Sequence, residues 1–254
     1  MIEDIKRLAQ TAGREINAIY QSRDWTVSLK EDSSPVTEAD LRANEIIVNG
    51  LAKISDDPVI SEEGGHELIT THPRFWLVDP LDGTRDFVAR RDTFVVCIAL
   101  IEKNEPILGV IHSPVTDELW WAIKGQGAFG PAGSLMNTRT DSLNMAAVGS
   151  RSVPSQRMQT LLEEFKVTRV EHFGSALKFC KMAEGHYDLY PRLGPMMEWD
   201  TAAGQIIAEE AGCKVIDLST GERLRYGKPG LANHGFVCSR ANLNLEPLLR
   251  RLKS

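Results

Sequence analysis

The sequence predicts an α/β protein in which layers of helix and sheet are stacked on one another. Three observations support this prediction. Apolar residues recur at helical spacing near the N-terminus, a series of short apolar strands follows, and strands then alternate with helices from residue 146 onward. The change of pattern divides the chain into an N-terminal α+β half over 1–145 and a C-terminal α/β half over 146–254, which we expect to be two domains.

The first half begins with two predicted helices. Apolar side chains recur every three or four residues between Ile2 and Ile19, with charged residues between them, which is typical of an amphipathic helix. A polar loop over 30–35 leads to Thr37, and a second helix follows with an apolar face that reaches Ile54.

The strands of the first half are short apolar runs between turn-forming residues, and the last three form a meander. They are predicted at 58–60, 75–78, 93–101, 107–112 and 119–123. Glycines crowd the stretch 125–133, for which we predict a loop.

The second half alternates between the two kinds of element. Strands are predicted at 146–149, 167–170, 187–190, 215–217 and 236–239. Helices are predicted at 156–165, 175–183 and 201–211, the last of which is ended by Gly212, and a final helix at 245–254 is expected to dock on the protein rather than to anchor it in a membrane.

Composition excludes several classes of protein. The 254 residues include 42% hydrophobic and 25% charged residues, values that are ordinary for a globular protein and exclude wholesale disorder. The net charge of −6 argues against broad nucleic-acid binding, which requires basic patches. The same acidity should repel an anionic substrate unless a cation intervenes.

The cysteines and the apolar runs indicate a cytoplasmic protein. The four cysteines lie far apart and form no C-x-x-C pair, so we predict reduced, buried thiols. The N-terminus is acidic and interrupted, unlike a signal peptide. The longest purely apolar run, FVVCIALI, is far shorter than the roughly 18 residues of a membrane-spanning helix, so no transmembrane segment is expected.

Candidate chemistry concentrates in the stretch DPLDGT, directly after the predicted strand at 75–78. Asp79 and Asp82 can converge on one point if the chain turns there, and Gly83 permits a close approach that a side chain would block. Taken alone, this pattern is more often a surface turn with solvated acids.

Three further acids lie where predicted strands end or helices begin. Glu62 follows a short strand and could face the same crevice, although a charged surface turn explains it equally well. Asp200 could be the N-cap of the helix at 201–211, and Asp40 fits a capping box with Thr37. These separate explanations do not account for the gathering of carboxylates around one predicted crevice.

A cluster of oxygen ligands suits a hard cation, in particular Mg²⁺. The six histidines are scattered and form no H-x-x-x-H pair, so a zinc hydrolase is not expected. The sequence also lacks a P-loop motif and a G-x-S-x-G elbow.

The motifs DPLDGT with Phe87, the upstream SEE and the downstream WDTAAG resemble the lithium-sensitive, magnesium-dependent inositol monophosphatase superfamily. Further stretches, including F-G-S-A-L-K-F-C and LYPR-x-GP, resemble its bacterial 3′(2′),5′-bisphosphate nucleotidase branch. The resemblance extends over about residues 1 to 240 and implies a layered αβαβα sandwich of the sugar-phosphatase type.

The resemblance also implies a metal site and a mechanism. The metal ligands would be Glu62, Asp79, the Leu81 carbonyl, Asp82 and Asp200, and they would hold two or three Mg²⁺ ions. Thr84 and Glu62 would orient and deprotonate the attacking water, and Asp40 would hold the Thr84 hydroxyl. The backbone N–H groups of Gly83 and Thr84, together with the helix that begins near Asp200, would stabilise the phosphoryl group.

The substrate implied by the resemblance is adenosine 3′,5′-bisphosphate, converted to AMP and phosphate in the clearance of a by-product of sulfate assimilation. Its binding residues would include Leu81, Gly83, Thr84 and Asp200 beside the metals, and Gly174, Ser175, Lys178 and Arg192 farther away. Ser175 and Lys178 are expected to share a helix face, although a lone lysine there would more often be solvated. Ser150 and Arg151 are weaker candidates.

Two alternatives stay open. The same machinery could serve an inositol monophosphate or a sugar bisphosphate, and some relatives act instead as regulatory binding partners of transcription complexes. We expect a monomer or homodimer in the cytoplasm, with peripheral contact at the inner membrane face as an alternative location.

Overall fold

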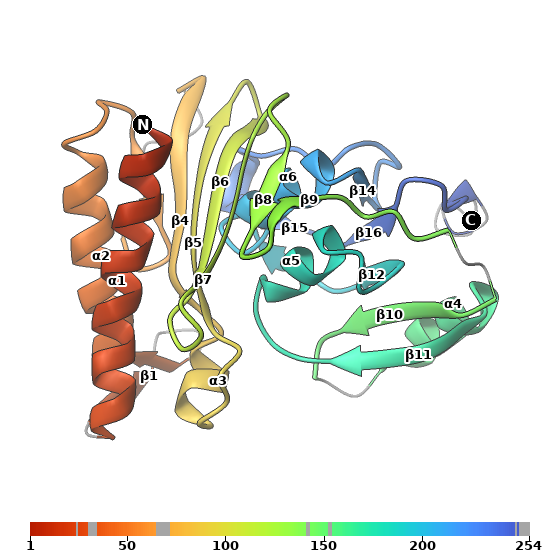
Figure 1. The fold of residues 1–254 in the computed structure, drawn as a ribbon, viewed down its shortest axis with the longest axis horizontal. Coiled ribbons are helices and arrows are strands. Elements are labelled where there is room, and N and C mark those ends of the chain that lie inside the picture. The colour runs from red at the N-terminus through yellow and green to blue at the C-terminus, as the bar shows by residue number, and fades with distance from the viewer. Residues whose placement is uncertain are drawn as a thin grey trace.

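The computed structural model describes residues 1–23, 25–29, 35–64, 72–140, 143–151, 154–246 and 248, and these form five stacked layers (Figure 1). Helices α1 (Ile2–Ser22) and α2 (Glu38–Leu51) form the first layer and a seven-stranded sheet the second. Helices α5 (Leu177–Ala183) and α6 (Ala202–Glu210) lie between this sheet and a five-stranded sheet. Helix α4 (Gln156–Glu164) packs on the outer side of the second sheet. The predicted αβαβα sandwich is therefore confirmed.

The seven-stranded sheet has the order β3-β4-β5-β6-β7-β8-β9, with β3 parallel to β4 and all other pairs antiparallel. Its strands are β3 (Val59–Ser61), β4 (Arg74–Asp82), β5 (Val95–Glu102), β6 (Glu105–Ser113), β7 (Glu118–Ile123), β8 (Ala128–Gly130) and β9 (Gly133–Leu135). The short helix α3 (Thr84–Val88) follows β4, and β1 (Val27–Leu29) pairs with β2 (Pro35–Thr37) beside it.

The five-stranded sheet has the order β11-β10-β12-β16-β14. Its strands are β10 (Met145–Gly149), β11 (Val167–His172), β12 (Leu189–Arg192), β14 (Cys213–Asp217) and β16 (Phe236–Arg240). A small ribbon of β13 (Met196–Met197) and β15 (Ala232–Asn233), with the 3₁₀ turn η2 (Pro229–Leu231), supports the loop before α6.

Burial explains why the outer helices form where the sequence predicts them. Ile5, Ala9, Ala12 and Ile16 of α1 are all fully buried, at the helical spacing expected of a face packed on a sheet. They join a core with residues of β4 and β5 such as Trp76. Each fully buried isoleucine contributes about 1.5–3 kcal/mol to folding.

Helix α6 connects the two sheets. It contacts β5, β6 and β7 of the first sheet and β14 of the second, and its residues Ala202 to Ala208 are all buried. The core around it includes side chains from both sequence halves, for example Ile60 and Cys238. All strands of the seven-stranded sheet precede residue 136 and all strands of the five-stranded sheet follow residue 144. Because the halves share this core, their division into two domains stays a prediction.

Two expectations about these elements differ from the structure, and two others fall on segments that the structure does not describe. The stretch 125–133 is not simply a loop, because it contains β8 and the start of β9, whose Ala128 and Leu135 are buried against the sheet. Strand β4 does not end at residue 78 but continues to Asp82 after a shift of register. The predicted helix at 245–254 and the predicted loop at 30–35 lie largely outside the described residues.

The cysteines and the helices bear on the predicted thiols and on the predicted lack of a transmembrane segment. All four cysteines are free and buried, as predicted. Within the described ranges, no helix combines the length and the apolar character that crossing a membrane requires.

Candidate active site

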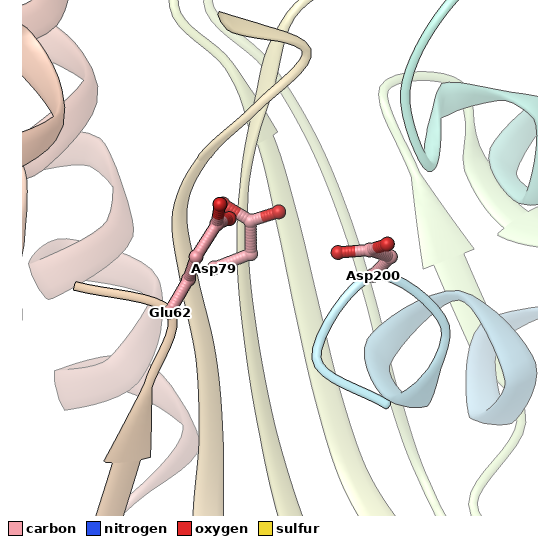
Figure 2. Close-up of side chains that lie close together, drawn as sticks. All are labelled: Glu62, Asp79 and Asp200. Atoms are coloured by element: carbon pink, nitrogen blue, oxygen red, sulfur yellow. The ribbon is translucent and has the colours of Figure 1, made fainter. Parts of the chain in front are cut away.

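Three carboxylates from distant parts of the chain meet at one point. Glu62 follows β3, Asp79 lies in β4, and Asp200 precedes α6 (Figure 2). One carboxylate oxygen from each lies within 4.8 Å of the other two. In Figure 2 the Asp200 carboxylate faces the other two across a gap. The prediction that these acids share one crevice is confirmed in its geometry.

The sheet explains how Glu62 and Asp79 become neighbours. Ser61 pairs with Val78 in the parallel register of β3 and β4, so the next residue of each strand is brought to the same edge. The Glu62 backbone N–H donates to the Val78 carbonyl at 3.1 Å and continues this pairing. Asp79 Oδ1 accepts from the Leu81 N–H at 3.0 Å, which fixes the turn that follows.

Asp200 arrives from the other half of the chain and is not the helix cap. Thr201 is the N-cap residue of α6 and makes no capping side-chain bond, so the alternative explanation of Asp200 as a simple N-cap is wrong. Asp200 Oδ2 instead accepts from the Met197 N–H at 3.3 Å. Since α6 packs on the first sheet, it delivers Asp200 to the edge where Asp79 lies.

The electrostatics of the cluster favour a cation. Burial raises the pKa of Asp79 well above its ordinary value, and repulsion from Glu62 and Asp82 adds to that shift. Burial likewise raises the pKa of Asp200 well above its usual range, with Asp82 and Glu62 as the next causes. Buried carboxylates that raise one another's pKa values are relieved by a divalent ion, and an all-oxygen donor set suits Mg²⁺. The residues therefore fit the predicted metal.

Asp82 belongs to the same cleft but not to the group of three. Burial raises its pKa to about 6, while the nearby Lys178 ammonium and a hydrogen bond from the Ala176 N–H act in the opposite direction. Oδ2 of Asp82 is the acceptor of that bond. The structure thus brings three of the predicted metal-binding carboxylates together and places the fourth beside them.

Thr84 is held by Asp40, as the resemblance implies. The Thr84 hydroxyl lies 2.9 Å from Asp40 Oδ1 and 3.3 Å from the Leu81 carbonyl oxygen. The other oxygen of Asp40 accepts from the Thr37 N–H at 2.8 Å and completes a capping box at the start of α2. Burial raises the pKa of Asp40, against the hydrogen bonds from Thr37 that lower it. Asp40 therefore forms the capping box and holds the Thr84 hydroxyl at once, and its part in catalysis stays a prediction.

Gly83 makes the turn into α3 possible. Its φ of 101° lies in the left-handed region, and a Cβ would lie 3.2 Å from the Phe94 Cα. The turn places Thr84 at the first position of the helix, with Asp82 and Thr84 both facing the cleft.

The segment before α5 differs from the prediction. The helix begins at Leu177, not at 175, and Ser175 has a φ of 58°, so Ser175 and Lys178 do not share a helix face. The Ser175 hydroxyl donates to the Thr93 carbonyl. Ser175 lies before the helix because two contacts hold this segment, the bond from Ser175 to Thr93 and the bond from the Ala176 N–H to Asp82.

Lys178 is buried under the cleft rather than displayed in it. Its side chain is 1% exposed, and Nζ donates to the carbonyls of Phe173 at 3.2 Å and Ser175 at 2.6 Å. Burial lowers its pKa to about 8, against the charge of Asp82 that raises it. Its contact with a substrate stays a prediction.

A cleft of about 570 Å³ joins most of the predicted residues. Those that line it are Glu62, Asp79, Leu81, Asp82, Gly83, Thr84, Ser150, Arg151, Gly174, Arg192 and Asp200. Asp40, Ser175 and Lys178 lie behind its wall and act on it through the hydrogen bonds given above.

The cleft also contains residues that the sequence analysis missed, namely Arg85, Asp86 and Arg91. For Arg85 and Asp86 a signal was available, because they directly follow the DPLDGT motif and lie within one helical turn of Thr84. Arg91 lies beyond the end of α3 and carries no such signal. On this side Arg192 is braced by bonds from Nη1 to Ser150 Oγ at 3.1 Å and from Nη2 to the Pro195 carbonyl at 3.0 Å.

A second pocket of about 530 Å³ shares Ser150 and Arg192 with the cleft. Its other walls include apolar side chains of α4 and the strands beneath, such as Met158, Leu162 and Pro191. An apolar pocket next to a charged cleft suits a ligand with a phosphate at one end and an apolar ring at the other.

Comparison with known proteins gives consistent results. A model of the inositol monophosphatase family matches residues 1–253. The 3′(2′),5′-bisphosphate nucleotidase CysQ of Salmonella typhimurium is 39% identical over 242 residues, which cover 93% of this chain and 98% of that relative. The CysQ protein of Escherichia coli is 39% identical over 245 residues, covering 94% of this chain and 99% of the relative.

Solved structures agree with these matches. CysQ from Bacteroides thetaiotaomicron, described as a bacterial member of the inositol monophosphatase family, has a TM-score of 0.80 at 36% identity and covers 93% of this chain and 95% of its own. An IMPase of Thermotoga maritima has a TM-score of 0.82 at 27% identity, with coverages of 99% and 95%. The similarity thus includes every layer of the fold.

Proposed function

This chain belongs to the inositol monophosphatase family, and we propose that it acts as a 3′(2′),5′-bisphosphate nucleotidase. The reaction is magnesium-dependent hydrolysis of adenosine 3′,5′-bisphosphate to AMP and phosphate, which serves the clearance of a by-product of sulfate assimilation. The identity of 39% to the nucleotidases of two bacteria, over nearly their whole length, supports this substrate above the others.

The metal would be held by Glu62, Asp79, the Leu81 carbonyl, Asp82 and Asp200, with two or three Mg²⁺ ions in the working enzyme. The convergence of Glu62, Asp79 and Asp200 within 4.8 Å is the observation that carries this assignment. Bound Mg²⁺ supplies Lewis-acid activation of the reacting phosphate and of the attacking water.

Thr84, Glu62 and Asp40 prepare the water. Since the Thr84 hydroxyl donates its hydrogen to Asp40, its oxygen is left to accept a hydrogen bond from the water. Glu62 then removes the proton, and the N–H groups of Gly83 and Thr84 stabilise the phosphoryl oxygens. No covalent intermediate with the protein is required.

The rest of the substrate is bound on the side of α5 and β12. The proposed contacts to the nucleotide are Gly174, Ser175, Lys178 and Arg192. The phosphate beside the metals would be contacted by Leu81, Gly83, Thr84 and Asp200. The apolar pocket beyond Arg192 and Ser150 supports this orientation, because it offers a wall for a nucleoside.

A substrate panel tests the proposal. Turnover of adenosine 3′,5′-bisphosphate, inositol 1-phosphate and fructose 1,6-bisphosphate is measured with Mg²⁺ and, as a control, with EDTA. We expect the adenosine bisphosphate to have the highest kcat/KM and EDTA to abolish all activity. A preference for inositol 1-phosphate, or turnover that persists in EDTA, would contradict it.

The cytoplasm is the proposed location, and a monomer or homodimer the proposed state. No observation favours the alternative of peripheral contact at the inner membrane face. A role as a regulatory partner of transcription complexes is favoured by no feature of the site.

A further inference from the structure

The cleft holds a second group of charged residues besides the metal-binding carboxylates, and we propose that this group binds the phosphate of the substrate that is not cleaved. In it, Arg151 and Arg91 are the binding groups, and Asp86 is the positioning residue that holds them. The inference rests on the proposed function, because only a bisphosphorylated substrate brings a second phosphate into the cleft.

Asp86 is already engaged and is therefore not available as a metal ligand. Its side chain is 6% exposed. The Thr93 hydroxyl donates to Oδ2 at 2.6 Å, and Arg91 Nη1 donates to Oδ1 at 3.2 Å. Arg151 Nε lies 3.3 Å from Oδ1. A carboxylate surrounded by these donors is a fixed anchor for two guanidinium groups.

Arg151 is held in one orientation by a closed ring of bonds. Its Nε binds Asp86, its Nη2 donates to Thr93 Oγ1 at 3.2 Å, and Thr93 in turn donates to Asp86. Among the described residues, Nη1 of Arg151 has no partner. The side chain is 36% exposed and lines the cleft, so its free N–H groups are available to a phosphate.

Arg91, like Arg151, binds Asp86 and lines the cleft. One of its nitrogens binds Asp86, while 51% of the side chain stays exposed at the cleft. Two guanidinium groups on one carboxylate leave a net positive charge that can bind a phosphate. The metal ions would neutralise the metal-binding carboxylates and bind the reacting phosphate. Arg151 and Arg91 supply the positive charge for the second phosphate, which the metal ions do not reach.

The same short helix sets the position of both phosphates. Thr84 and Asp86 lie within one turn of α3, so the reacting phosphate beside Thr84 and the second phosphate beside the Asp86 arginines are spaced by a rigid element. Gly174 packs directly against this anchor, since a Cβ there would lie 1.9 Å from Asp86 Oδ2. A glycine at 174 is thus required for Asp86 to keep its position.

The test compares two substrates that differ only in the second phosphate. Adenosine 3′,5′-bisphosphate and adenosine 3′-monophosphate have the same reacting group, and kcat and KM are measured for each with wild-type protein and with Arg151→Ala. Charge-assisted hydrogen bonds of this kind correspond to about 10- to 100-fold in affinity. We expect kcat/KM for the bisphosphate to fall by that factor, mainly through KM, and the monophosphate value to change by less than about 3-fold.

Two further variants and a control complete the experiment. Asp86→Asn keeps the shape of the anchor but removes its charge, so a smaller loss confined to the bisphosphate is expected. Arg151→Lys keeps the charge without the planar fork, should lie between the wild type and Arg151→Ala, and provides the measurement if Arg151→Ala fails to fold. Arg7→Ala, which removes an exposed arginine of α1 paired with Asp4, should change neither substrate.

The outcomes separate this inference from the proposed function. Equal losses for both substrates in Arg151→Ala, or no loss for either, would overturn the inference while wild-type turnover of the bisphosphate leaves the proposed function standing. If wild-type protein with Mg²⁺ failed to hydrolyse the bisphosphate, the proposed function would fall and the inference with it.

Discussion

Asp79 and Asp86 lie in the same cleft, only one strand end and one turn apart, yet their surroundings give them opposite properties. Burial and the neighbouring carboxylates raise the pKa of Asp79 well above its ordinary value. At Asp86 burial acts in the same direction, but the hydrogen bonds from Thr93 and Arg91 outweigh it and lower the pKa. The first acid is surrounded by like charges and the second by arginines.

The comparison explains how the proposed metal site and the proposed phosphate site can share one cleft. The carboxylates around Asp79 store unfavourable charge that a divalent ion relieves, whereas Asp86 uses its charge internally to present two arginines. The identity of the residue does not decide its role; the partners that the fold supplies do.

The largest effect should come from neutralising the acidic side of the cleft. Asp82→Asn removes a proposed metal ligand while keeping the side-chain shape. We therefore expect the magnesium-dependent kcat/KM for adenosine 3′,5′-bisphosphate to fall by at least about 100-fold. The circular dichroism spectrum should be unchanged. Near-normal turnover would refute the metal assignment, and Asp86→Asn is the matched control, since it should spare the monophosphate reaction.

Lys178→Met tests the buried ammonium group, whose charge acts on both Asp82 and Asp86. The substitution leaves the Phe173 and Ser175 carbonyls without their donor, which should lower the free energy of unfolding by about 1–3 kcal/mol. KM for the bisphosphate should also rise, because the segment 173–176 would move. Thermal melting and steady-state kinetics measure the two effects. A rise in KM with an unchanged Tm would support the proposed contact of the ammonium with the nucleotide, whereas a fall in Tm with an unchanged KM would contradict that contact.

The two acids should also give pH effects of opposite sign in metal-free protein. Groups whose pKa is raised, such as Asp79, contribute stability below the unfolded value of 3.8 that is lost as pH rises through the folded pKa. Asp86, whose pKa is lowered, contributes stability above 3.8 that is lost as pH falls.

In EDTA, Asp79→Asn should therefore raise Tm at pH 7, by about 2–4 °C for each kcal/mol of repulsion removed, and should reduce the gain in Tm that wild type shows on acidification to pH 5. Asp86→Asn should lower Tm at pH 7. Melting curves across this range measure both, and the same sign of change in the two variants would contradict the comparison.

The smallest effect is expected from Gly174→Ala. The added methyl group would displace the Asp86 carboxylate and with it Arg151 and Arg91, so the ratio of kcat/KM for bisphosphate over monophosphate should fall by about 3- to 10-fold. Arg7→Ala on α1, far from the cleft, is the control and should leave the ratio unchanged. A ratio that stays constant in Gly174→Ala would show that the anchor tolerates the displacement.

The sequence predicted the layers and the cluster of acids because both depend on local patterns. Periodicity located α1 and α2, and the strand ends of β3 and β4 located Glu62 and Asp79. The start of α5 was predicted wrongly because Ser175 is held by Thr93 and its neighbour Ala176 by Asp82, contacts between residues far apart in the chain. Arg85 and Asp86 were missed although they directly follow the DPLDGT motif, whereas Arg91 could not be predicted, since only the folded cleft shows that it binds Asp86.

The passage of α6 between the two sheets has a consequence for how the protein becomes active. During synthesis the segments with Glu62 and Asp79 leave the ribosome long before Asp200, and the closure of so long a loop is slow. Because Asp200 directly precedes α6, the third carboxylate can join the other two only once α6 packs on the first sheet. The cluster of three carboxylates therefore requires segments from both halves of the chain, and a chain synthesised only as far as residue 199 lacks one of its members.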